Sequence, residues 1–178
     1  MFKWLSVGIV ALGLLLLFLV VLRAKLKSSA NDLDKEMTRL AKAAVSRAKQ
    51  EFATELDFSS DSVEKVEAIL AKLHTEHQAK AFTEEEMADE AALWAAYIGA
   101  VIKQKKPGHW ECDSQIAGKN TFPLIHDDGD EVYLLFRVRN RIVNGDIDNV
   151  WMAYQGLYHP ERFKRINLED FISEASEK

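Results

Sequence analysis

Five histidines and a single cysteine are the side chains of this sequence best suited to metal binding or catalysis. His74 and His77 are three residues apart on an expected helix, so both imidazoles could face one metal ion. A third ligand would have to come from elsewhere. The candidates are Glu76, His109, Cys112 and His126. The pair lacks the His-Glu-x-x-His spacing of a helical zinc site, so we interpret both histidines as solvated and predict no metal site.

Cys112 could act as a nucleophile if His109 or His126 served as its base. However, Cys112 alternates with Trp110 in an expected strand, and free cysteine packs as a small hydrophobic residue. The sequence also holds no glycine-rich phosphate loop and no Gly-x-Ser-x-Gly motif. We therefore predict no catalytic residue and no cofactor. The alternative is a small membrane-tethered hydrolase or metalloprotein that uses Cys112 and the nearby histidines.

The segment 95–112 contains a group of lysines that resembles part of an active site. They stand just before a Pro-Gly pair and are Lys103, Lys105 and Lys106. Cations stabilise the C-terminal end of a helix and Pro-Gly ends it, so we interpret the group as a helix terminus. Gly99 lies inside the same helix, where glycine costs about 1 kcal/mol relative to alanine. Its position predicts that another helix approaches closely there.

Residues 144–149 and three arginines are the remaining candidates for binding. The run Asn144-Gly-Asp-Ile-Asp-Asn149 resembles a calcium loop, but its glycine is second rather than sixth and no glutamate closes the loop. We interpret the run as the C-cap of one helix followed by the N-cap of the next. Arg137, Arg139 and Arg141 form a basic patch that is either a solvated, ion-paired face or a contact for an acidic partner or anionic lipid. These arginines are the predicted partner-binding residues.

An uncharged, apolar run over residues 4–22 precedes all of these candidates. As a helix it would cover roughly 28 Å, close to the ~30 Å hydrocarbon core of a bilayer. A cleaved signal peptide would have a shorter apolar region followed by a cleavage site, whereas basic residues follow here at once: Arg23, Lys25 and Lys27. Residues 1–27 are therefore expected to form a retained, single-pass transmembrane anchor. The excess of lysine and arginine after the span places the C-terminal domain in the cytoplasm.

Residues 28–56 are expected to form a helical stalk after the anchor. Asn31 can cap the helix, and apolar residues then recur every three or four positions: Leu33, Met37, Leu40, Ala44, Ala48 and Phe52. This stripe could pair with a second copy in a homodimeric coiled coil, or it could pack on its own domain. Two alanines in the stripe make a weak coiled-coil seam, so both arrangements stay open.

Residues 57–160 are expected to form an α+β globular domain, followed by a charged tail over residues 161–178. Two amphipathic helices begin after Asp61 and after Thr83, which makes a capping box with Glu86. Turn signals then separate three short strands near 109–114, 121–126 and 131–136, an antiparallel meander. Short helices over 138–144 and 149–158 follow, the second with Asp148 as its N-cap. The expected fold is two main helices packed on this sheet, with Asn167 opening one further short helix in the tail.

Three segments together resemble an uncharacterised bacterial family, one of the domains of unknown function. The segments are LDFSSDSVEKVEAIL, YIGAVIKQKKPGHW and VRNRIVNGDIDNVWMAY, within roughly residues 56–158. That family often has an acidic residue after the glycine of the second segment, where this chain has Ala100. The resemblance implies a small α+β domain and no established activity. With the anchor, it indicates a protein of the bacterial inner membrane.

Composition narrows the range of functions further. The 178-residue chain has a net charge of −5, which gives no electrostatic reason to expect a nucleic-acid partner. Its single cysteine cannot form an internal disulfide, so no redox compartment is implied. We expect a non-enzymatic, membrane-anchored protein-binding module, such as an immunity or accessory protein that neutralises a toxin.

Overall fold

The computed structural model describes residues 32–159. The predicted anchor over residues 4–22, its basic collar and the charged tail over residues 161–178 lie outside this part of the chain. Within residues 32–159, none of the helices combines the length and the apolar character that crossing a membrane requires.

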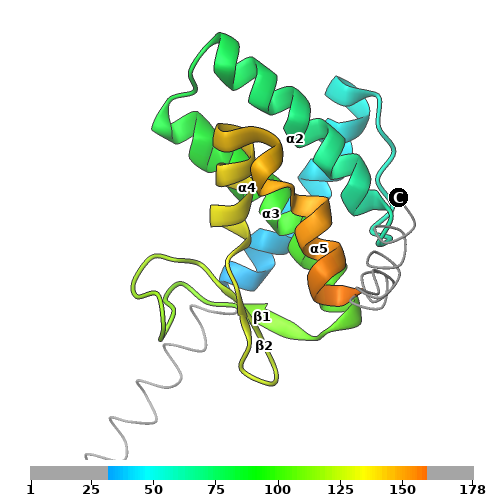
Figure 1. Cartoon of the computed structure of the whole chain (residues 1–178). Coiled ribbons are helices and arrows are strands. Elements are labelled where there is room, and N and C mark those ends of the chain that lie inside the picture. The colour runs from blue at the N-terminus through cyan, green and yellow to red at the C-terminus, as the bar shows by residue number, and fades with distance from the viewer. Residues whose placement is uncertain (1–31, 160–178) are drawn as a thin grey trace, which may run out of the picture.

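The domain is mostly helical, with a small antiparallel sheet at one end (Figure 1). A first helix extends to residue 52 from residue 32, where the described part starts. The other helices are α2 (Ser62–Ala79), α3 (Glu84–Lys105), α4 (Leu134–Asn144) and α5 (Val150–Tyr158), with a 3-10 turn, η1 (Gly145–Asp148). The strands are β1 (Gly108–Trp110), β2 (Leu124–His126) and β3 (Glu131–Val132), in the order β1-β2-β3. The predicted three-stranded antiparallel sheet is confirmed.

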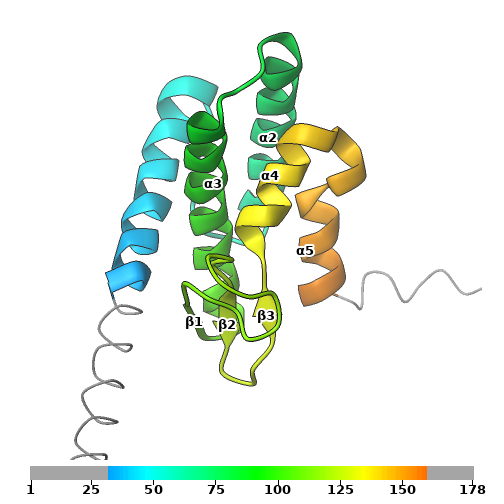
Figure 2. The same ribbon diagram turned by 90° about the vertical axis from the view of Figure 1, so that its left-hand side faces the viewer.

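The predicted packing of two main helices on the sheet is only partly right. The strands are shorter than expected, and the helices pack mainly on one another while the sheet covers one end of them (Figure 2). The third strand was expected to continue to residue 136, but α4 begins at Leu134. Leu134, Val138 and Ile142 are buried at helical spacing, so a helix places all three in the core.

The first helix packs on its own domain. It runs beside α3 (Figure 2). Met37, Ala44 and Ala48 of the predicted stripe are at most 5% exposed, as is the neighbouring Ala41. The other members of the stripe are half-buried: Leu33, Leu40 and Phe52. Ion pairs to α3 link its two ends, from Asp34 to Lys103 at 2.8 Å and from Arg47 to Glu90 at 2.7 Å. The sequence left open whether this helix pairs with a second copy or packs on its own domain, and the structure shows it packed on its own domain. A coiled coil through the same stripe would have to take these residues out of the core.

The start signals and apolar faces of α2 and α3 agree with the sequence prediction in most respects. Thr83 and Glu86 form the expected capping box. The predicted stripes are buried: Val63, Val66, Ile69, Leu70 and Leu73 on α2, and Met87, Ala91, Trp94, Ile98 and Val101 on α3. Asp61 is the N-cap of α2, but its side chain makes no capping hydrogen bond. Ser59 Oγ instead accepts a hydrogen bond from the Ser62 amide at 3.3 Å.

Gly99 is approached by a tryptophan ring, not by the helix that the sequence predicted. A Cβ atom at this position would lie 2.4 Å from Cζ2 of Trp110, which is buried. Trp110 is the last residue of β1, which begins three residues after the end of α3. Its backbone N–H donates to Asp34 of the first helix at 3.2 Å. The close packing that the glycine indicated is therefore present, between α3 and β1.

The segment that resembles a calcium loop joins α4 to α5. Gly145 caps α4 with a φ of 77°, in the left-handed region that favours glycine. The N-cap of α5 is Asn149, whose side chain accepts a hydrogen bond from the Met152 amide at 2.8 Å, and not Asp148 as predicted. Asp148 accepts a hydrogen bond from the Asn144 side chain at 2.7 Å. The cap-to-cap interpretation is confirmed with a shift of one residue.

Candidate functional site

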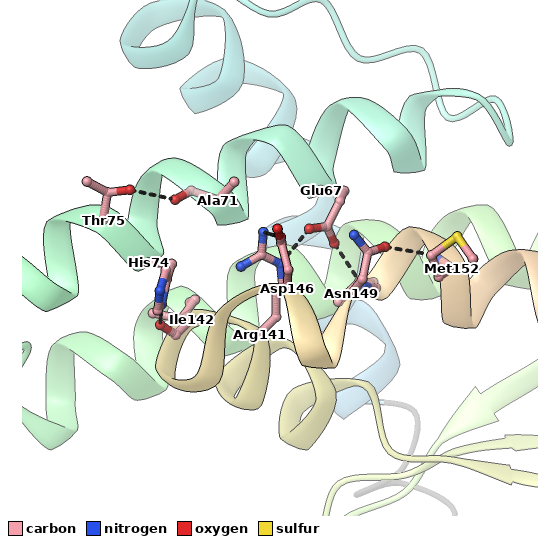
Figure 3. Close-up of polar contacts among 10 residues, drawn as sticks. Glu67, Ala71, His74, Thr75, Arg141, Ile142, Asp146, Asn149 and Met152 are labelled. Atoms are coloured by element: carbon pink, nitrogen blue, oxygen red, sulfur yellow. Dashed lines mark hydrogen bonds and ion pairs between the residues drawn. The ribbon is translucent and has the colours of Figure 1, made fainter.

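The structure gives the two histidines of α2 separate partners. His74 Nδ1 donates to the Ile142 carbonyl at 2.7 Å, which ties α2 to α4 (Figure 3). His77 Nδ1 accepts a hydrogen bond from the Phe82 amide at 3.0 Å and so stabilises the turn into α3. Within residues 32–159, no group of three or more histidine, cysteine, aspartate or glutamate side chains could hold a metal ion.

Cys112 does not occupy the strand position that the sequence predicted. The strand ends at Trp110, and Cys112 is half-buried in the segment that follows. His109 is exposed and lies 3.2 Å from Glu111, and both ring nitrogens of His126 have partners. No hydrogen bond within the described part of the chain joins the Cys112 thiol to either histidine. The structure therefore does not bring the nucleophile and base of the alternative hypothesis into contact.

His126 and Tyr158 join the sheet to the last helix. His126 Nδ1 lies 3.1 Å from the Pro107 carbonyl, which can only accept, so this nitrogen carries the proton. Nε2 then accepts a hydrogen bond from the Tyr158 hydroxyl at 3.0 Å. Burial raises the pKa of Tyr158 to about 12. The tyrosine therefore stays neutral in the folded chain at pH values where an unfolded tyrosine, with a pKa of about 10, ionises.

The stability of the domain is expected to fall as the pH rises from about 10 to about 12. In this window the folded state holds a proton on Tyr158 that the unfolded state has lost. Lys106 acts in the same direction, because hydrogen bonds with Asp128 and Asp130 raise its pKa to about 12. Tyr158→Phe should make the decline less steep, as measured by thermal unfolding at several pH values. Equal slopes in the two proteins would contradict the role of Tyr158.

Arg141 is not part of a surface patch, which corrects the sequence prediction. Its side chain is buried between α2, α4 and α5 (Figure 3). Nε donates to Oε1 of Glu67, and Nη2 donates to Asp146 Oδ1 at 2.9 Å. The second oxygen of Glu67 accepts a hydrogen bond from the Val150 amide at 2.7 Å, at the first residue of α5. One carboxylate thus fixes α4 and α5 on α2, and the basic surface of α4 consists of Arg137 and Arg139 alone.

The three segments on which the predicted family resemblance rests meet one another in the structure. Tyr97 of the second segment accepts a hydrogen bond from the Phe58 amide of the first at 2.8 Å, and its hydroxyl lies 2.6 Å from Ser62 Oγ. The contact between Glu67 and Arg141 joins the first segment to the third. These motif residues form contacts between helices, so a structural role accounts for their polar side chains.

An apolar groove lies between α3, the start of α4 and the loop that precedes β2. We call it the α3–α4 groove, and its volume is about 550 Å³. Small side chains of α3 and larger ones of the loop and α4 line it: Ala88, Ala91, Ala117, Phe122, Leu135 and Phe136. Polar side chains stand around them: Glu84, Asn120, Thr121, Tyr133 and Arg139. The groove is thus suited to bind apolar side chains, with an orienting charge at its rim.

Phe136 stands at the edge of this groove with 63% of its surface exposed. It also lines a second depression of about 300 Å³, the α4–α5 hollow, together with Val132, Arg137 and Leu157. The two depressions therefore adjoin at Tyr133 and Phe136, and the hollow is the more polar of the two, since Glu131, Asn140 and Asp148 also line it. Sequence reasoning missed this exposed phenylalanine because it expected a strand to residue 136. In a helix whose buried positions are Leu134 and Val138, Phe136 faces solvent.

The polar residues beside the groove are engaged in structural hydrogen bonds. Ser114 and Tyr133 donate to the carboxylate of Glu131, and these hydrogen bonds lower the pKa of Glu131. Ser114 Oγ also accepts hydrogen bonds from the amides of Ile116 at 2.9 Å and Ala117 at 2.7 Å. The serine hydroxyl thus closes the turn that forms one wall of the groove.

At the rim, Arg139 makes only a weak ion pair. Its Nη2 lies 3.5 Å from Glu84 Oε1, and the side chains are 44% and 90% exposed. Exposed pairs of this kind contribute about 0–1 kcal/mol. A carboxylate on a bound partner can therefore compete with Glu84 for the guanidinium at little cost.

The chain matches no family model, no curated protein and no solved structure in comparisons with known proteins. The resemblance of the three segments therefore stays a prediction. The function has to be argued from the geometry of the described residues.

Proposed function

We propose that this chain is a non-enzymatic protein-binding module held at a membrane, and that the α3–α4 groove is its binding surface. The observation that carries the proposal is Phe136, a large apolar side chain that is 63% exposed beside an apolar groove of about 550 Å³. Exposed apolar surface next to a depression is typical of interaction sites, where aromatic residues contribute much of the binding energy. An immunity or accessory protein that neutralises a toxin is the specific form that we propose.

The lining of the groove defines the chemistry of the partner segment. The alanines of α3 leave space for apolar side chains, and Phe122 and Leu135 supply walls. Arg139 at the rim favours an acidic residue next to the apolar ones. An amphipathic helix that inserts apolar residues at positions i, i+3, i+4 and i+7 matches such a groove. The partner is therefore expected to present an apolar stripe flanked by carboxylates.

Photo-crosslinking at position 136 tests this proposal in the full-length chain. p-Benzoylphenylalanine in place of Phe136 should form an adduct with one protein in membranes of the native host. The same probe at Ile147, which is 87% exposed on η1, should not form that adduct. The adduct at position 136 should fall several-fold in Ala88→Trp, because the indole would fill the groove.

Ala68→Trp is the matched control for the groove-filling variant. Ala68 is exposed on α2 and is not part of the groove lining, so its replacement should leave the adduct unchanged. An adduct that forms equally from both probe positions, or that survives Ala88→Trp, would show that the groove is not the binding surface.

The membrane location in this proposal rests on the apolar sequence of residues 4–22. We propose a single span that leaves the C-terminal domain in the cytoplasm. The full-length protein should stay with membranes after a carbonate wash, while a chain starting near Asn31 should be soluble. Release of the full-length chain by carbonate would contradict the anchor, and strong activity of a periplasm-specific reporter fused after Lys178 would reverse the orientation.

A further inference from the structure

We propose that residues 167–175 of the same chain occupy the α3–α4 groove when no partner is bound. This inference concerns regulation of the binding surface proposed above and rests on that function. It assigns the groove an occupant inside the chain, which an external partner would have to displace.

The described part of the chain ends beside the α4–α5 hollow, which adjoins the groove at Phe136. Leu157, in the last turn of α5, is 56% exposed and lines the α4–α5 hollow next to Phe136. The hydrogen bond from Tyr158 to His126 fixes this end of α5 on the sheet. The last described turn of α5 therefore lies close to Phe136, which lines both depressions.

The sequence that follows contains the pattern that the groove is expected to bind. Residues 160–178 lie outside the described part, and their sequence includes Leu168, Phe171, Ile172 and Ala175 at positions i, i+3, i+4 and i+7. In a helix these residues share one face. Asn167 is suited to cap such a helix, and Glu169 and Glu174 place carboxylates on the two borders of the apolar face. The segment thus combines an apolar stripe with acidic flanks.

The arginines of α4 provide the complementary charge. Arg139 stands at the rim of the groove in its weak pair with Glu84, and Arg137 lines the hollow on the way from α5. A carboxylate that borders the apolar face of the docked segment would lie on this side. Because the hollow also contains Glu131 and Asp148, the stronger attraction for a carboxylate is at Arg139.

Length and energetics both permit this docking. Residues 160–166 could span up to roughly 24 Å when extended. A helix this short is marginal in water by itself, so it gains from an apolar surface. A tether of this length gives an effective concentration of about 1 mM or more, so that even weak docking is populated. The apparent affinity for a partner that needs the same groove is then the intrinsic affinity multiplied by the fraction of molecules with an open groove.

The test uses the purified full-length chain in detergent, with p-benzoylphenylalanine at position 136 and no partner present. Illumination should give an adduct of monomer mass whose crosslinked peptide maps to residues 166–178. Phe171→Asp should reduce this adduct at least five-fold. Ser173→Asp is the matched control, because it places the same charge on the opposite face of the helix and should leave the adduct in place. An adduct elsewhere in the domain, an adduct of dimer mass, no protein adduct, or equal behaviour of the two variants would overturn the proposal.

A second measurement separates this proposal from the proposed function. In membranes of the native host, Phe171→Asp should increase the partner adduct at position 136 several-fold, because the groove is no longer occupied. If Phe171→Asp leaves the partner adduct unchanged and no intramolecular adduct forms, the tail proposal is contradicted and the proposed binding function is not. An intramolecular adduct without any partner adduct would support the tail contact and count against the binding function.

Discussion

Gly99→Leu is expected to destabilise the domain by about 3 kcal/mol or more, at the upper end of the cost of overpacking a core. Even a Cβ atom at this position would lie 2.4 Å from Cζ2 of Trp110, whose side chain is only 2% exposed. A hollow of about 180 Å³ beside the ring, lined by Met37 and Ala100 among others, gives room for a small shift of the indole. Gly99→Ala should therefore cost less, about 1 kcal/mol, whereas leucine exceeds what this shift can accommodate.

Gly156→Ala is the matched control for the Gly99 variants. Gly156 also lies inside a helix, but a Cβ atom there would meet nothing within 4 Å. The substitution should leave stability unchanged or raise it by up to about 1 kcal/mol through helix propensity. Unfolding of the full-length protein in detergent, followed by circular dichroism, measures all three variants. A Gly99→Leu protein as stable as Gly156→Ala would show that Trp110 does not pack against α3 as described.

Glu67→Ala is expected to cost about 3–5 kcal/mol, the range for breaking a buried ion pair by removing one partner. The substitution leaves the buried Arg141 with only the exposed Asp146 as an anionic partner, and arginine cannot lose its proton. It also leaves the Val150 amide at the start of α5 without its acceptor. Arg141→Ala should cost somewhat less, because the Glu67 carboxylate keeps the Val150 amide and can take up a proton.

Arg139→Ala is the control for this pair, two positions away on the same helix. Its contact with Glu84 is long and exposed, so its loss should change stability by less than about 1 kcal/mol.

The double variant Glu67→Ala, Arg141→Ala should cost less than the sum of the single changes, because no unpaired charge is left in the core. Circular dichroism melts of the unsubstituted protein, the two single variants and the double variant measure the coupling between the two side chains. Strict additivity would mean that the two side chains are not coupled.

Local sequence signals predicted the helices that define the core. The capping box of Thr83 with Glu86, the buried stripes of α2 and α3, and the Pro-Gly stop after Lys106 all depend on residues within about one turn of each other. Such signals act in the same way in any tertiary context, so they can be read before the fold is known. The start of α4 could not be read in this way. Around residues 131–136 the alternating pattern of a strand and the helical spacing of Leu134 with Val138 compete, and burial of the apolar side chains decided for the helix.

Burial of charge and the shape of the groove were decided by tertiary structure alone. Three arginines at alternate positions read as one basic patch, yet Arg141 is buried because its acceptor comes from Glu67 on α2, 74 residues earlier in the chain. The α3–α4 groove exists only where α3, the loop before β2 and the start of α4 come together, and no single segment contains its pattern. Gly99 indicated a close contact, but which residue makes it depended on how the chain turns back after α3. Spacing along one element determines which face is apolar, whereas the partner of that face is set by contacts between residues far apart in sequence.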